Sequence, residues 1–96
     1  MAEEKKIPIN MSDDIAGGVY SNMAVISHSD NEFIMDFVFA LPPKGKVNSR
    51  VIMSPLHAKR FLKVLEKNLQ NFESKFGIIK DNPNPPPNMG IEFSKN

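Results

Sequence analysis

Asp36 and Arg50 are the residues of this sequence with the clearest potential for chemistry. Asp36 interrupts an apolar stretch, and Arg50 lies at the comparable depth of the next one, so a turn near residues 43–44 makes them opposite or diagonal neighbours in a sheet. A carboxylate in such a place can act as a base with a tuned pKa. It can also form a structural ion pair that fixes strand register or a subunit contact. We favour the structural role, because no second acid or nucleophile has a matching spacing.

The two histidines offer weaker chemistry. His57 occupies the first turn of an expected helix, where it could contact a phosphate, transfer a proton or simply face solvent. His28 falls at a hairpin edge, while Tyr20 and Asn22 fit either a small pocket or strand packing. Two His and no Cys are too few for a transition-metal site, and no phosphate loop or hydrolase motif is present. We therefore expect no enzyme activity, cofactor, metal or small-molecule substrate.

Charge is distributed unevenly along the chain. Residues 1–36 carry seven acids and two lysines, a net charge of −5, whereas residues 44–67 carry seven bases and one glutamate, a net charge of +6. The bases that could contact the phosphates of single-stranded DNA or RNA are Lys44, Lys46, Lys59, Arg60, Lys63 and Lys67. Single-strand binders also stack bases on exposed aromatic rings, whereas the Phe side chains here alternate towards the expected core. Nucleic-acid binding is therefore the alternative hypothesis, and a solvated helix surface is favoured.

The size of the chain favours self-association. Its 96 residues allow one domain with an ordered core of about 60 residues, and a domain of that size buries only about 60% of its unfolded surface. Disulfides are excluded by the absence of Cys, which leaves oligomerisation as the means of adding stability. No signal peptide and no window of about 18 apolar residues is present, so we expect no membrane span and a cytoplasmic location.

A long helix is predicted between Ser54 and Gly77. Ser54 is a suitable N-cap, Pro55 suits the first helical position, and Gly77 suits the left-handed position after the last turn. One face carries apolar residues at alternating steps of four and three: Ala58, Leu62, Leu65, Leu69, Phe72 and Phe76.

Three strands are predicted before this helix, at residues 19–28, 32–41 and 46–53. The middle one alternates large apolar residues on one face: Phe33, Met35, Phe37, Phe39 and Leu41. The sequence thus predicts an α+β fold, a three-stranded (at most four-stranded) antiparallel meander followed by one long C-terminal helix that packs on the phenylalanine side of the sheet.

The other side of the sheet is predicted to be a self-association face. A two-residue turn at residues 30–31 pairs positions whose numbers sum to 61. This register assigns one set of residues to this face. A slip of one residue would exchange the two faces. The set is Val19, Met23, Val25, Ile34, Asp36, Val38, Arg50 and Ile52. It is too apolar for open water, and one helix cannot cover both sides, so we expect a homodimer or larger homo-oligomer.

The chain is divided into an N-terminal tail or arm (residues 1–16), a single βββα domain (17–79) and a Pro-rich flexible tail (80–96). The runs EFIMDFVFALPP and NSRVIMSPLHAKRFLKVLEKNLQNFESKFG, preceded by GVYSN, resemble a small bacterial and archaeal family, domain of unknown function 3467. The resemblance covers roughly residues 18–79 and leaves the tails outside it. It implies a prokaryotic setting and supports the domain limits, but it implies no activity, cofactor or catalytic residue.

Overall fold

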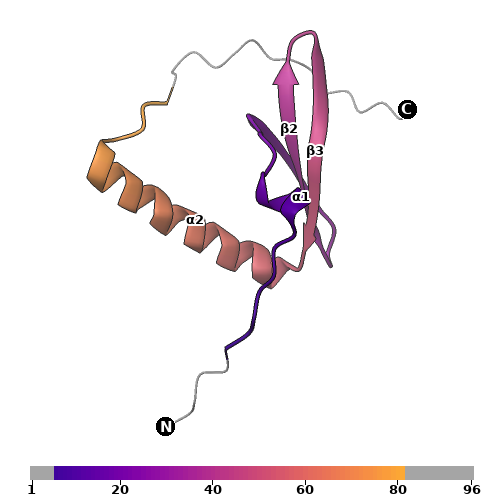
Figure 1. Ribbon diagram of the computed structural model, residues 1–96, viewed down its shortest axis with the longest axis horizontal. Coiled ribbons are helices and arrows are strands. Elements are labelled where there is room, and N and C mark those ends of the chain that lie inside the picture. The colour runs from indigo at the N-terminus through magenta and orange to yellow at the C-terminus, as the bar shows by residue number, and fades with distance from the viewer. Residues whose placement is uncertain (1–5, 82–96) are drawn as a thin grey trace. The chain divides into compact units, whose positions relative to one another are not determined.

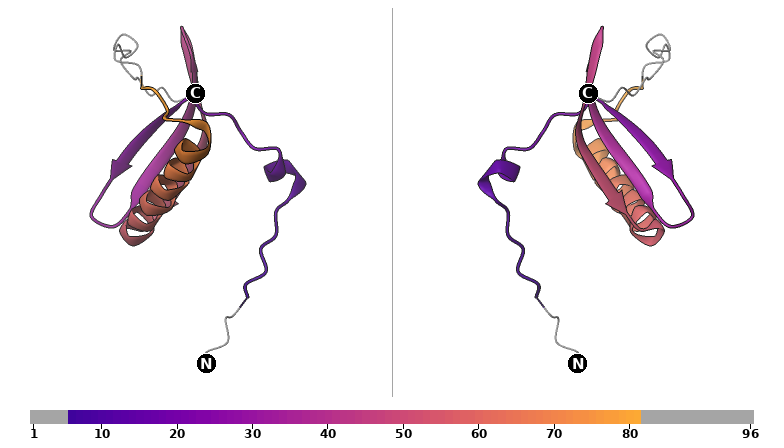
Figure 2. Two further views of the ribbon diagram at one scale, coloured as in Figure 1. Left: turned by 90° about the vertical axis from the view of Figure 1, so that its left-hand side faces the viewer. Right: turned by 90° about the vertical axis from the view of Figure 1, so that its right-hand side faces the viewer.

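The fold is a three-stranded antiparallel sheet followed by a long helix, as predicted for the α+β class. The computed structural model describes residues 6–81. Its elements are α1 (Asp13–Ala16), β1 (Met23–His28), β2 (Phe33–Leu41), β3 (Lys44–Met53) and α2 (Pro55–Phe76) (Figure 1). The strand order is β1-β2-β3, with β2 in the middle (Figure 2). The chain divides into two units at Arg60 and Phe61, so the packing of α2 on the sheet stays a prediction.

The β1–β2 hairpin has the predicted register. Its turn is stabilised by Ser29, whose backbone N–H donates to the Glu32 carbonyl at 2.9 Å and whose Oγ accepts the N–H groups of Asn31 and Glu32 at 3.2 and 3.3 Å. Such side-chain bonds to the following backbone are typical of Ser in tight turns. Val25 accordingly pairs with Asp36, and Met23 with Val38.

The β2–β3 hairpin is tighter than predicted. Only Pro42 and Pro43 form the turn, and β3 begins at Lys44, two residues earlier than expected. Pairing is regular from Leu41 opposite Lys44 back to Val38 opposite Val47, and it then shifts by one residue so that Phe37 pairs with Ser49. Asn48 is the extra residue of this β-bulge.

The region before β1 differs from the prediction in two ways. Residues 13–16 form the short helical turn α1 within the segment interpreted as a tail or arm. The first strand begins at Met23 rather than at Val19, and Val19 is 63% exposed outside any strand. Gly18, with a φ of +74°, turns the chain just before Val19, in a conformation that glycine adopts most readily. The sheet therefore does not place Val19 beside its proposed partners.

Helix α2 begins and ends as its sequence predicts. The Ser54 Oγ accepts the N–H of His57 at 3.1 Å, which satisfies one of the unpaired donors of the first turn. At the other end Gly77 has a φ of +99°, and its N–H donates to the Glu73 carbonyl at 2.9 Å. A left-handed glycine in this position is a common helix terminator.

The buried part of the sheet is centred on β2. Within residues 6–81 the buried apolar side chains are Met35, Val38 and Met53, and the buried charged residue is Asp36. Met35 and Asp36 are adjacent on β2 and therefore lie on opposite faces of the sheet. The middle strand thus contributes the most enclosed side chain to each face.

Candidate functional site

The sheet has two chemically different faces, which the Cα pairing assigns residue by residue. We call one the Asp36 face: Met23, Val25, Ser27, Ile34, Asp36, Val38, Ala40, Gly45, Val47, Arg50 and Ile52. We call the other the Phe37 face: Ala24, Ile26, His28, Phe33, Met35, Phe37, Phe39, Leu41, Lys44, Lys46, Ser49, Val51 and Met53. Every residue predicted for the self-association face lies on the Asp36 face except Val19.

The bulge at Asn48 changes the face of one apolar residue. Strict alternation along the third strand groups Val47 with Val51 and Met53. The structure instead pairs Val47 with Val38, because the extra residue reverses the alternation between Val47 and Ser49. The Asp36 face therefore gains Val47, which the sequence pattern assigns to the other face, while Val19 is lost from it.

Asp36 and Arg50 form a two-point ion pair at the centre of this face. They are directly opposite on β2 and β3, with Arg50 Nε 2.7 Å from Asp36 Oδ1 and Arg50 Nη2 2.9 Å from Asp36 Oδ2. The guanidinium fork matches both carboxylate oxygens, the geometry that makes such hydrogen bonds short and directional. The two side chains differ in exposure, at 5% for Asp36 and 58% for Arg50. The carboxylate is therefore covered while the guanidinium still reaches solvent.

The pair also shifts the acid–base equilibria of both groups. The hydrogen bonds from Arg50 are the main reason that the pKa of Asp36 lies below its ordinary value, and burial opposes this only in part. The same hydrogen bonds raise the pKa of the Arg50 guanidinium. A base for catalysis needs the opposite shift, towards neutral pH. The ionised carboxylate is thus suited to a structural role.

The register that creates the ion pair depends on the bulge. Near the turn, Leu41 pairs with Lys44 and Val38 with Val47. If this register continued along the two strands, Asp36 would lie opposite Ser49, and Arg50 would lie on the other face. The extra residue Asn48 corrects this by one position. Its side-chain Nδ2 donates to the Tyr20 carbonyl at 2.9 Å, which ties the bulge to the segment before β1.

That segment is fastened to the sheet by several side-chain hydrogen bonds. The Asn22 side-chain amide donates to the Ala40 carbonyl at 2.9 Å and accepts the Ala40 N–H at 2.8 Å, so it substitutes for a backbone partner. Ser21 Oγ donates to the Met23 carbonyl at 2.9 Å, and the Tyr20 ring packs on Phe39 with centroids 5.6 Å apart. Residues 20–22, which precede β1, therefore contact both β2 and the bulge of β3. Tyr20 and Asn22 act here in strand packing, one of the two roles predicted for them.

The role of Asn48 does not follow from the periodicity of the sequence. An asparagine in the middle of a strand-like run is unfavourable for an ordinary strand, and this is the signal that could have indicated a bulge. Neither its position nor its partner follows from the alternation of apolar residues, since Tyr20 lies on a distant part of the chain.

The other candidate residues are spread over several elements. His28 stacks on Phe33 with ring centroids 5.1 Å apart, and the backbone N–H of His57 takes part in the α2 cap. The bases Lys44 and Lys46 lie on β3, and the remaining four predicted nucleic-acid contacts, Lys59, Arg60, Lys63 and Lys67, lie on α2. A single basic surface made from both groups stays a prediction.

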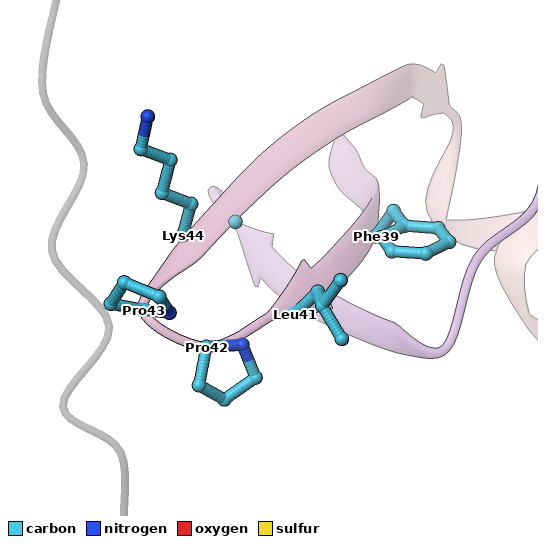
Figure 3. A pocket seen from close by; sticks show the side chains of 6 residues that line it. Phe39, Leu41, Pro42, Pro43 and Lys44 are labelled. Carbon is cyan, nitrogen blue, oxygen red and sulfur yellow. The ribbon is translucent and has the colours of Figure 1, made fainter.

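A hollow lies beside the β2–β3 turn (Figure 3). Its volume is about 320 Å³, and it is lined by Phe39, Leu41, Pro42, Pro43, Lys44 and Gly45. Figure 3 shows the Lys44 side chain extending away from the Phe39 ring. Ligand sites combine an apolar lining with several convergent polar groups. This hollow has an apolar lining but lacks such a group of polar side chains.

Within residues 6–81 no three His, Asp or Glu side chains gather where they could hold a metal ion. Neither described helix combines the length and apolar composition needed to cross a bilayer.

Fold and site together define a small α+β protein whose sheet carries an ion pair, with a covered carboxylate, in a largely apolar face. The chain belongs to the family described as "Protein of unknown function (DUF3467)", whose model matches residues 1–81. The predicted resemblance is confirmed, and the match extends to residue 1, so the N-terminal segment is part of the family pattern. The predicted Pro-rich tail lies, from residue 82 onwards, outside the described residues. No curated protein and no solved structure is significantly similar to the chain.

Proposed function

We propose that this protein is a non-enzymatic interaction module that self-associates through its Asp36 face. The observation that supports the proposal is the composition of that face, in which apolar residues from all three strands surround one internally neutralised ion pair. Two of these apolar side chains remain well exposed, Val47 at 38% and Ile52 at 54%. Burying them against another protein surface removes apolar area from water and is favourable.

The small core supports the same proposal. Few apolar side chains of the described residues are buried, and the sheet has only three strands. Domains of this size usually need disulfides, a metal or a partner subunit to be stable. The chain has no cysteine for disulfides, which favours a partner subunit as the means of gaining stability.

A second copy of the chain is the partner that the charges favour. The Arg50 guanidinium is neutralised by Asp36 of its own chain, so two Asp36 faces brought together do not repel one another strongly. Two-fold dimers use the same patch on both subunits, and the patch must therefore tolerate its own copy. A face with an unpaired lysine or glutamate at its centre would not meet this requirement.

The test is the solution mass of charge variants, measured by light scattering at tens of micromolar. Ile52→Lys places a charge on the exposed edge of the Asp36 face and should lower the solution mass by breaking the contact between two such faces. Val64→Lys is the matched control, because Val64 is a similarly exposed apolar residue (62%) on α2, outside the apolar stripe. An Ile52→Lys protein with the wild-type mass, or a monomeric wild type, would contradict the proposal.

A further inference from the structure

The two edges of the sheet are not equivalent, and only one of them is protected against pairing. Strand β3 carries Lys44, Lys46 and Arg50 together with the bulge at Asn48. Charges and bulges on an edge strand prevent other strands from adding to it. Strand β1 has none of these features: its six residues, Met23–His28, include no Asp, Glu, Lys, Arg, Pro or Gly and pair regularly with β2.

The backbone groups on the open edge of β1 can be identified from the hairpin. The hydrogen bond from Ser29 N–H to the Glu32 carbonyl marks that pair as a hydrogen-bonded one. Hydrogen-bonded and non-hydrogen-bonded pairs alternate along an antiparallel ladder. Ser27, Val25 and Met23 therefore direct their backbone groups towards β2, whereas those of Ala24, Ile26 and His28 point away from it. Within residues 6–81 these outward groups have no backbone partner.

We infer that β1 is a second self-association surface, which pairs antiparallel with β1 of another copy around a two-fold axis at Ile26. This register sets Ile26 opposite its own counterpart and Ala24 opposite His28 of the other copy. Each of these pairs can exchange two backbone hydrogen bonds, so all three outward-pointing residues are satisfied. The axis is perpendicular to the sheet, so the two Asp36 faces become one continuous face.

A second copy fits this edge better than the β3 edge fits its own copy. The β1 edge carries no Asp, Glu, Lys or Arg side chain, whereas pairing β3 with β3 would bring lysines and arginines together. The Ile26 side chain is 57% exposed, and in this register it gains an apolar contact across the axis. The inference extends the proposed function, since edge pairing doubles the apolar face available for face-to-face association.

Proline at position 26 tests the pairing with little damage to the hairpin. The N–H of Ile26 points outwards, so Ile26→Pro removes both hydrogen bonds of the Ile26 pair and no bond to β2. Proline is tolerated on edge strands. Ile26→Thr keeps the N–H and the β-branched shape, and it serves as the matched control. We expect Ile26→Pro to halve the solution mass and Ile26→Thr to retain it. An unchanged mass for Ile26→Pro, with circular dichroism showing a folded chain, would overturn the inference.

Amide hydrogen exchange gives an independent result at residue level. In the wild-type assembly the amides of Ala24, Ile26 and His28 should be protected, and they should lose protection when the protein is diluted to monomer. Val25 and Ser27 donate to β2 and should stay protected in both states. Fast exchange of the outward amides in the assembly would overturn the inference, as would protection that persists on dilution, which would mean that a segment of the same chain covers the edge.

The two proposals fail separately. Ile52 lies on β3 and Ile26 on β1, at opposite edges of the sheet. A protein that Ile52→Lys dissociates and Ile26→Pro leaves unchanged associates by its face alone, which overturns the edge pairing and leaves the proposed function standing. The reverse result overturns the Asp36 face contact and supports the edge pairing.

Discussion

The two faces of β2 are built from alternate residues of one strand, yet they differ in chemistry. The Phe37 face is apolar at every β2 position, so a slip of two residues would still pair large apolar side chains with one another. The Asp36 face contains one carboxylate that must meet one guanidinium, and only one register achieves this. The Phe37 face thus contributes buried apolar volume, whereas the Asp36 face admits only the register in which the carboxylate meets the guanidinium.

The largest loss of stability is expected on the Phe37 face. Met35→Ala removes most of a buried side chain, and such truncations cost about 2–5 kcal/mol. Because small domains have total stabilities of about 5 kcal/mol and upwards, this variant should be largely unfolded in urea concentrations that leave the wild type folded. Met35→Leu conserves volume and should lose less than about 1.5 kcal/mol. Equal losses for the two variants would show that Met35 is not tightly packed.

The second prediction concerns an asymmetry within the ion pair. Arg50→Leu leaves the covered Asp36 carboxylate without a partner, whereas Asp36→Leu leaves an arginine that is already 58% exposed and can be hydrated. Arg50→Leu should therefore lower the free energy of unfolding more than Asp36→Leu, and the double variant should lose less than the sum. Urea denaturation at neutral pH measures all three. A larger loss for Asp36→Leu would contradict the structural role assigned to Arg50.

The third prediction concerns how the contribution of Asp36 to the free energy of unfolding depends on pH. The pKa of Asp36 is lowered in the folded protein, so its stabilising contribution is complete above the unfolded pKa of about 4 and is lost as the pH falls through the folded value. The difference in unfolding free energy between the wild type and Asp36→Asn should thus be constant from about pH 5 to neutral and shrink in more acidic solution. A difference that grows as the pH falls would contradict the sign of the shift.

The smallest effect is expected at the bulge. Asn48→Ala removes the hydrogen bond to the Tyr20 carbonyl and should cost about 1 kcal/mol. Asn68→Ala is the matched control. The Nδ2 of Asn68 also donates to a backbone carbonyl at 2.9 Å, but Asn68 occupies an exposed position within α2. That variant should be neutral or slightly stabilising, since alanine favours helix. A neutral Asn48→Ala would show that the bulge forms without its side-chain anchor.

Much of the fold follows from local signals in the sequence. The turn chemistry of Ser29 to Asn31 predicts the β1–β2 register, and Ser54, Pro55 and Gly77 predict both ends of α2. These predictions succeed because turn and cap residues act on the backbone within a few positions of themselves. The opposition of Asp36 and Arg50 was also predicted, although as one of two possible alignments.

The bulge and the start of β1 do not follow from the sequence pattern. Asn48 bonds to Tyr20, and Asn22 bonds to Ala40, so both depend on partners far away in the chain. Periodicity therefore assigns Val47 to the wrong face and extends the first strand back to Val19. The short helix α1 does not follow from the pattern either, because a single turn leaves no periodic signal.

Sedimentation equilibrium of the full-length protein is the most direct test of self-association. We expect a mass that rises with concentration to at least twice the 10.8 kDa of one chain, reaching this value by tens of micromolar. A mass of 10.8 kDa that does not change over the whole range would contradict it.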